Sequence, residues 1–266
     1  LAYVVIDGTV YDVTSIKEWR DGRHYGLYAG RDLTEYFNSC HKSEKNILKK
    51  LKTLMHTYSH AWVLLYAFIY FPWFTYLERH VTDNYFVIHS IFDDYIPFCE
   101  YFIIPYLLWF AYIAVTLGYL FFNDKQGFYK ASAIMFSGMT IFLIICTVFP
   151  NGLNLRPEVF TRDNFCIELV KRIYQTDTPT NVLPSLHVYN SICCYIAISH
   201  CEKLQHSRLI QKGSLVLSIL IILSTMFLKQ HSVVDVVAAC VMAYFMYSLI
   251  YAQEGAKSPR LARQVI

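Results

Sequence analysis

Charge is scarce in this sequence. Asp, Glu, Lys and Arg together make up 16% of its 266 residues, whereas soluble domains usually carry about 25%. Hydrophobic residues reach 55%, and they gather in runs close to the ~20 residues that a helix needs to cross a bilayer. The composition argues against a soluble globular protein and predicts a polytopic membrane protein.

Zinc-type cysteine spacings and nucleic-acid-type basic patches are also missing. None of the eight cysteines belongs to a C-x-x-C pair, so we expect no zinc site built from cysteine. Lys and Arg number 23 against 20 Asp and Glu, and no cluster of them is interleaved with aromatic residues. This pattern argues against nucleic acid as a partner.

Residues 1–53 are more polar than the rest of the chain. The stretch AYVVIDGTVYDVT has β-branched residues on both sides of a D-G pair, which is typical of a hairpin, and a helix containing DLTEYF follows. We expect a small α+β module here. Because the sequence begins at Leu1, inside a strand-like run, we also expect this module to be truncated at its start.

The remainder has the pattern of a bundle of membrane helices. Six apolar runs of near-spanning length follow one another, which predicts an all-α six-span transmembrane domain over residues 54–254 and a cytoplasmic tail over 255–266. The runs cover residues 57–77, 101–122, 129–149, 185–201, 213–230 and 233–252.

Basic residues are distributed unevenly among the connections. They gather in segment 42–52, around Lys125 and in the tail, whereas the alternate connections carry many Asp and Glu residues. The side richer in Lys and Arg is usually cytoplasmic, which predicts that both termini are cytoplasmic. Segments 78–100 and 150–184 and the turn near 229–233 would then face the extracytoplasmic side.

Ionisable side chains collect at these outward ends of the spans. His231 and Asp235 are four residues apart, so a helix would place them on one face, where the carboxylate can fix the imidazole and leave its other nitrogen as a nucleophile. His187 begins another span and could act as a general acid or base. Arg156 offers a fork of N–H donors that suits phosphate oxygens. Together with Ser185, these residues indicate phosphoryl transfer at the level of the lipid headgroups.

Each of these residues also has a simpler interpretation. Asp235 and Ser185 could only cap the helices that follow them. Arg156 and Lys229 could be interfacial anchors whose charged ends reach the headgroups. The two aspartates at 93–94 could bind a cation, although a solvated pair is the favoured interpretation.

Three short motifs occur in an informative order. The stretches LRP, PSLH and STMFLKQHSVVD resemble the motifs K-x6-R-P, P-S-G-H and S-R-x5-H-x3-D of the type 2 phosphatidic acid phosphatase superfamily. The resemblance covers about residues 57–252 and implies a six-span fold with an outward active site. By this resemblance the site residues are the nucleophile His231, its partner Asp235, the general acid His187 and the phosphate-binding Arg156 and Ser185.

The sequence departs from the motifs of this family at three positions. Phe149 stands where the first motif has lysine, Leu186 replaces the glycine, and Thr225 replaces the arginine of the third motif. Two phosphate-binding cations are therefore missing, and Lys229 and Lys171 are candidates to replace them. The PSLH and KQHxxxD forms look more like the branch that includes sphingolipid phosphotransferases.

The first module resembles a short cytochrome b5-like haem domain over residues 1–53. The stretches YVVIDGTVYDVT and HYGLYAGRDLTEYFNSCH carry the likeness, which implies that His24 and His41 are the axial ligands of a haem b. The iron of this haem is the one metal that we expect. Since the usual H-P-G-G is H-Y-G here, a shell that no longer binds haem remains an alternative.

These patterns support three hypotheses. The first is a metal-independent phosphoric ester hydrolase that cleaves a phosphomonoester or diphosphate lipid through a phosphohistidine, embedded among the membrane lipids of a bacterial plasma membrane. The second is a transferase that passes the phosphoryl headgroup to the hydroxyl of another lipid. The third is a haem-binding redox or sensor protein, with an electron donor as its partner and a degenerate phosphatase scaffold.

Overall fold

The computed structural model describes residues 1–40, 53, 57–82 and 84–251. The chain divides into two compact units, Leu1–Ser59 and His60–Ile266, and each is described by itself. The lysine-rich segment 42–52, the candidate haem ligand His41 and the tail 255–266 lie outside the described residues.

The N-terminal unit is built on two short antiparallel hairpins. Its elements are, in chain order, β1 (Tyr3–Ile6), β2 (Thr9–Asp12), η1 (Lys17–Gly22), β3 (Arg23–His24), β4 (Leu27–Tyr28) and α1 (Thr34–Cys40). In the turn between β1 and β2, Asp7 and Gly8 have φ values of 49° and 77°, which suits the Asp-Gly pair found there. Val4, Val13 and Leu33 form the buried core. The predicted hairpin and helix are both present.

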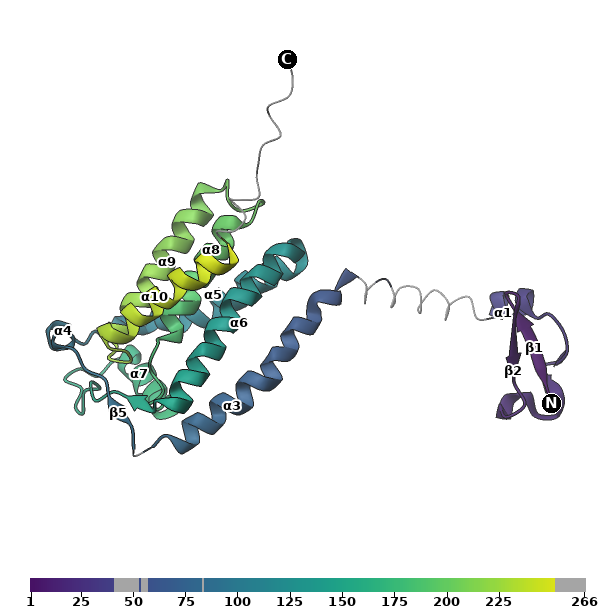
Figure 1. Ribbon diagram of the computed structural model, residues 1–266, viewed down its shortest axis with the longest axis horizontal. Helices are drawn as coiled ribbons and strands as arrows, with labels where there is room; N and C mark the ends of the chain where they lie inside the picture. Colours follow the sequence, from purple (N-terminus) through teal and green to yellow (C-terminus); the bar gives the residue numbers. More distant parts are fainter. Residues whose placement is uncertain (41–52, 54–56, 83, 252–266) are drawn as a thin grey trace, which may run out of the picture. The chain divides into compact units, whose positions relative to one another are not determined.

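Longer helical segments form the second unit (Figure 1). They are, in chain order, η2 (Ser59–Tyr66), α3 (Ala67–His80), α5 (Ile103–Asn123), α6 (Lys125–Val148), α8 (Leu186–His200), α9 (Arg208–Phe227) and α10 (Val233–Ile250). Helix α8 is the central one, because it packs against α5, α6, α9 and α10. At its crossing with α6, a Cβ on Gly138 would overlap the Tyr189 ring, so only glycine permits this close approach.

Four of the described helices are long and apolar enough to cross a membrane. They are Glu100–Asn123, Lys125–Val148, Arg208–Phe227 and Val233–Ile250. The other two predicted spans are helical but differ from this type. Residues 59–80 run as η2 followed by α3, and α8 has only 15 residues, nine of them buried against other helices. The membrane character is confirmed, whereas the count of six spans stays a prediction.

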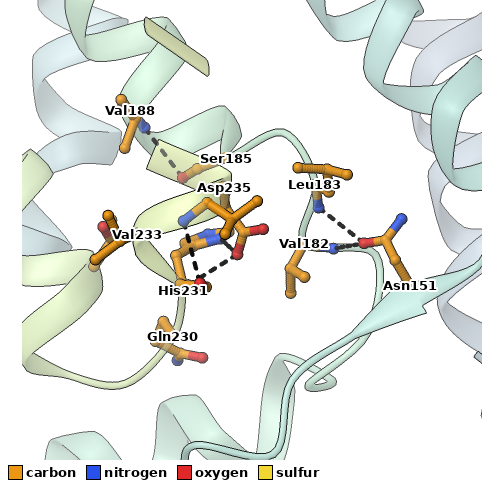
Figure 2. A network of polar contacts seen from close by, with 12 residues as sticks. Asn151, Val182, Leu183, Ser185, Val188, Gln230, His231, Val233 and Asp235 are labelled. Carbon is orange, nitrogen blue, oxygen red and sulfur yellow. Dashed lines mark hydrogen bonds and ion pairs between the residues drawn. The ribbon is translucent and has the colours of Figure 1, made fainter. Parts of the chain in front are cut away.

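Short elements gather at the end of the bundle where α3 and α6 finish (Figure 1). They are β5 (Phe86–Val87), α4 (Ile91–Tyr95), η3 (Glu100–Phe102), β6 (Asn151–Gly152) and α7 (Phe165–Thr176), and β5 pairs with β6 in parallel. The side-chain oxygen of Asn151 accepts the backbone N–H groups of Val182 and Leu183, both at 2.9 Å (Figure 2). These bonds fix the segment that leads into α8, where the first candidate site residues begin.

Candidate active site

His231 lies in the tight turn between α9 and α10. The carbonyl oxygen of Thr225 accepts the backbone N–H groups of Gln230 and His231 at 2.9 and 3.1 Å. Lys229 adopts a φ of 54° in the same turn. His231 is 8% exposed, so the turn holds a mostly buried imidazole at the junction of two helices.

Asp235 contacts both the start of α10 and His231. Its Oδ2 accepts the backbone N–H of Ser232 at 2.9 Å, while the Ser232 hydroxyl caps the first turn, which makes a reciprocal capping box. The same Oδ2 lies 3.4 Å from Nδ1 of His231 without hydrogen-bond geometry (Figure 2). The capping interpretation of Asp235 therefore describes one of its contacts. Its second contact is with Nδ1 of His231. Nε2 of His231 therefore lies on the edge of the ring that faces away from the carboxylate.

His187 lies in the first turn of α8, beside two aromatic rings of α5. Its ring centroid is 4.5 Å from that of Tyr106, 4.2 Å from that of Trp109 and 5.8 Å from that of His231. Nε2 of His187 is buried and has no hydrogen-bond partner among the described residues. Leaving a buried polar atom without a hydrogen bond costs about 1–3 kcal/mol of stability. This nitrogen is therefore suited to form a hydrogen bond with a bound molecule. The structure thus brings together the two predicted catalytic histidines.

Asp93 joins α4 to the turn that carries His231. Its carboxylate accepts the Ser232 hydroxyl at 2.6 Å and the Val233 backbone N–H at 2.8 Å, and its carbonyl oxygen accepts Nζ of Lys229 at 2.7 Å. Asp93 is 2% exposed, so its interpretation as part of a solvated pair is wrong. It is a buried residue whose hydrogen bonds fix Lys229, Ser232 and Val233, on either side of His231.

Arg156 binds the loop after α7 and the turn before α10. Nη1 donates to the carbonyl oxygens of Tyr174 and Asp177 at 3.1 and 2.9 Å. Nη2 donates to the carbonyl oxygen of Thr178 at 3.3 Å and to Oε1 of Gln230 at 2.6 Å. Burial lowers the pKa of Arg156, although a guanidinium remains charged at any ordinary pH. The guanidinium therefore donates to three carbonyl oxygens and to the Gln230 side chain. It does not line the cavity next to His187 and His231.

Gln230 continues this chain of contacts. Because its Oε1 accepts from Arg156, the orientation of the amide is fixed and Nε2 must be the donor. Nε2 is buried without a partner in the described part of the chain. The same holds for Nε1 of Trp109. Two neutral N–H donors therefore lie beside the histidines with unused bonding capacity.

A cavity of about 230 Å³ adjoins His187 and His231, which both line it. The exposed Phe71 of α3 and Phe110 of α5 line it as well. Helix α3 packs against α6 (Figure 1), and exposed aromatic side chains of both α3 and α5 border the cavity. A lipid could place its polar end beside the histidines from there.

The three residues that depart from the motifs of the resembled family each have defined surroundings in the structure. The ring of Phe149 lies 5.4 Å from that of Phe86. The buried hydroxyl of Thr225 donates to the carbonyl oxygen of Ile222 at 2.8 Å. Leu186 lines the cavity. The family's two cationic positions are thus occupied by an aromatic ring and a helix-bound hydroxyl.

The remaining predicted phosphate-binding residues have partners within the chain. The Ser185 hydroxyl is fully buried and accepts the backbone N–H of Val188 at 3.4 Å, as a helix cap (Figure 2). Nζ of Lys171 pairs with Glu168 at 2.6 Å, and Lys229 donates to the carbonyl oxygen of Asp93. None of these three residues lines the cavity, and their contact with phosphate stays a prediction.

Sequence reasoning missed several residues that line the cavity. Gln230 directly precedes His231 in the sequence, and Glu78 and Asp177 are two of the acidic residues in the predicted outward connections. The adjacency of Gln230 to the nucleophile is a usable signal. No local pattern predicts that Glu78 and Asp177 line the same cavity, because they are 99 positions apart in the sequence and tertiary packing brings them to it.

The N-terminal unit has a cavity of its own, of about 930 Å³. Its lining is mostly apolar and includes Val4, Leu33, Phe37 and His24. Nδ1 of His24 lies 3.0 Å from the carbonyl oxygen of Glu18, which assigns the hydrogen to Nδ1 and leaves Nε2 available to a metal. The described residues therefore fit one axial side of a haem.

Comparison with known proteins matches two parts of the chain. Residues 1–60 match the cytochrome b5-like heme/steroid binding domain, and residues 131–259 match the PAP2 superfamily. No curated protein and no solved structure matches the chain. The two likenesses noted in the sequence are thereby confirmed.

Proposed function

We propose that this chain, which combines a PAP2 superfamily region with an N-terminal cytochrome b5-like region, is an integral membrane lipid phosphatase. It hydrolyses a phosphomonoester or diphosphate lipid through a phosphohistidine. The observation that carries the proposal is the pair His187 and His231 on one cavity, with Asp235 against the far side of His231.

The first step forms a bond from His231 to phosphorus. Nε2 attacks, the bond between phosphorus and the lipid oxygen breaks, and His187 gives its proton to that oxygen. Asp235 stabilises the charge that develops on the imidazole of His231. The N–H groups of Gln230 and Trp109 can bind the phosphoryl oxygens in place of the missing cations.

The second step releases phosphate. His187 takes a proton from a water molecule, the oxygen of that water bonds to phosphorus, and the bond to His231 breaks. Inorganic phosphate leaves, and both histidines return to their starting protonation. Because the steps use only side chains of the chain, we expect activity to survive EDTA.

The topology belongs to the same proposal. Asp93 of α4 bonds Ser232 and Val233 beside His231, and the His187 ring lies 5.8 Å from that of His231. Helix α4 lies at the same end of the bundle as β5 and α7 (Figure 1). With six spans and both termini cytoplasmic, this end faces the extracytoplasmic side. Lipid headgroups at that boundary would meet the cavity directly.

The proposal is tested by the inorganic phosphate that the detergent-purified protein releases from a panel of lipid phosphates, with and without EDTA. Release that is unaffected by EDTA supports it. Labelled phosphoryl headgroup that appears on an added lipid alcohol, in place of free phosphate, would instead indicate a headgroup transferase.

Asp93→Asn is expected to lower kcat by about 10- to 100-fold, the usual effect of losing a partner that orients a site residue. The two carboxylate oxygens accept the backbone N–H groups of Ser90 and Val233 as well as the Ser232 hydroxyl. An amide nitrogen cannot accept an N–H, so the turn carrying His231 would shift. Since Asp93 does not line the cavity, KM should change little. Steady-state kinetics with a lipid phosphate check this split.

The matched control for Asp93 is its neighbour Asp94. Its side chain is 59% exposed and pairs with His89, so Asp94→Asn should leave kcat unchanged. Equal kcat values for Asp93→Asn and the wild type would refute the positioning role.

A second function is proposed for the N-terminal unit, namely the binding of a haem. Its apolar cavity and the contact of His24 with Glu18 through Nδ1 rather than Nε2 support this, and His41 would be the second axial ligand. Bound haem iron would supply one-electron transfer. The chain's own part is to shield the group from water and to fix the ligand tautomer through Glu18.

Haem binding predicts a Soret absorption band from the full-length protein after addition of haem. His24→Ala and His41→Ala should each abolish or shift the band, because each removes an axial ligand. His206→Ala is the control, since this exposed histidine lies in the connection between α8 and α9. A band that is identical in all three variants would contradict the assignment.

A further inference from the structure

The cavity beside His187 and His231 is acidic. Among the described residues, its charged lining side chains are Glu78 of α3 and Asp177, which follows α7, and the lining includes no Lys or Arg. Two nearby cations, Arg156 and Lys229, donate to carbonyl oxygens and to Gln230 and do not line the cavity. This charge pattern is unexpected for a site that receives phosphate.

Neutral groups hold both carboxylates in place. Glu78 accepts the Thr178 hydroxyl at 2.5 Å and Nδ2 of Asn181 at 2.9 Å, and Asp177 accepts the Tyr106 hydroxyl at 3.2 Å. These donors orient the carboxylates without adding a formal positive charge. Burial raises the pKa of Asp177, and the Tyr106 hydroxyl and the charge of Arg156 act in the opposite direction.

Aromatic rings share the wall with Glu78. Tyr70, Phe74 and Glu78 follow one another at intervals of four along α3, which places them on one helix face, and all three line the cavity. Trp109 of α5 lines it too. Carboxylates and aromatic rings are the groups that attract an organic ammonium ion.

We propose that the cavity selects a lipid phosphate that carries an ammonium group close to its phosphate. The phosphate lies at the histidines, and the ammonium lies among Glu78, Asp177 and the rings. A phosphate without such a cation would meet two carboxylates in the cavity lining, on which Arg156 acts only from outside that lining. This inference rests on the proposed function and names the substrate class of the same site.

The ammonium can come from two sources. In a long-chain amino-alcohol phosphate it belongs to the lipid, and hydrolysis releases inorganic phosphate. In an aminoalkyl phosphodiester it belongs to the headgroup, and hydrolysis releases the headgroup phosphate. In both cases His231 bonds to phosphorus, the bond to the lipid oxygen breaks, His187 protonates that oxygen, and water then takes the place of His231.

Three probes separate these sources. Sphingosine 1-phosphate carries the ammonium on the lipid, phosphatidylethanolamine carries it on the headgroup, and phosphatidic acid lacks it. The measurement is kcat/KM for the water-soluble phosphate product, with the detergent-purified full chain. We expect one of the two ammonium lipids to be the best substrate.

Glu78→Gln gives the decisive comparison, since glutamine keeps the size and can still bond Thr178 and Asn181. We expect kcat/KM for the ammonium lipid to fall by about 10- to 100-fold, the scale of a charged hydrogen bond. For phosphatidic acid it should stay equal or rise, because a repulsive charge is removed. Glu158→Gln, at an exposed loop position that does not line the cavity, should change neither.

Asp177→Asn repeats the test if the first variant does not fold, and it should shift the same ratio in the same direction. An equal loss on all substrates would mean a structural role and would overturn the inference, as would a wild-type preference for phosphatidic acid. In both cases the phosphatase proposal would stand. The absence of turnover on any probe would reject the proposed function itself, and the inference with it.

Discussion

Replacing His231 by glutamine is expected to lower the rate of phosphate release by about 10⁴-fold or more, the size of loss seen when covalent enzymes lose their nucleophile. The other groups of the site would remain, so substrate binding should persist. The measurement is kcat for the best lipid phosphate, with the unfolding temperature of each protein recorded beside it.

The contacts of His231 indicate that this loss would come from the missing imidazole and not from a disrupted turn. Its backbone N–H is held by Thr225, and its ring lies against the buried Asp235, so a glutamine there would keep the turn without supplying a nucleophile. His89→Gln is the control, because His89 is exposed, belongs to the same end of the bundle and pairs with Asp94. Residual activity of the His231→Gln protein within tenfold of the wild type would reject the nucleophile assignment.

Replacing His187 by asparagine is expected to produce a loss that depends on the leaving group. For a lipid alkoxide, which needs a proton as it departs, we expect about 10²- to 10⁴-fold slower turnover. A nitrophenyl phosphate ester has a leaving group that needs no proton, so His231 should still attack it at a near-normal rate.

The second step should then limit this variant. Since His187 also activates the water, the phosphohistidine should accumulate, and nitrophenol should appear as a burst equal to the amount of enzyme before slow turnover. Stopped-flow absorbance measures both phases. If the variant loses the nitrophenyl and lipid substrates to the same extent and shows no burst, His187 has another role.

Local patterns in the sequence predicted those parts of the structure that local forces determine. The Asp7-Gly8 turn and the apolar helices α5, α6, α9 and α10 depend on backbone preference and on transfer of side chains into lipid. Helix α8 was predicted as a span from the same kind of run. Nine of its 15 residues are buried, and it packs against four other helices, a feature that composition does not predict because an apolar side chain can face lipid or protein; its crossing of the membrane stays a prediction.

Some contacts of the site are likewise predicted by local sequence spacing, and others depend on tertiary packing. His231 and Asp235 are close in the sequence, so their spacing predicted their contact, whereas the approach of His187 depends on how α8 packs. The bonds from Asp93 to Ser232 and Val233 join segments about 140 positions apart, and no local pattern announces them. The same is true of Glu78 and Asp177, which give the cavity its charge.

The charge of the cavity also bears on the departures from the family motifs. Phe149 and Thr225 remove cations that would bind a bare phosphate, and Arg156 is held by carbonyl oxygens and Gln230. The N–H groups of Gln230 and Trp109, which have no hydrogen-bond partner among the described residues, remain beside the histidines. A site with neutral donors and two carboxylates suits a phosphate whose charge is already balanced within the substrate.

The central claim is that His231 becomes phosphorylated during turnover. It is tested most directly by adding a lipid phosphate labelled with ³²P on the phosphoryl group and quenching within one turnover. The account predicts label on the protein that is labile in acid, stable in base and absent from the His231→Gln variant. Full turnover by the wild type with no such label, or label that persists in the variant, would contradict it.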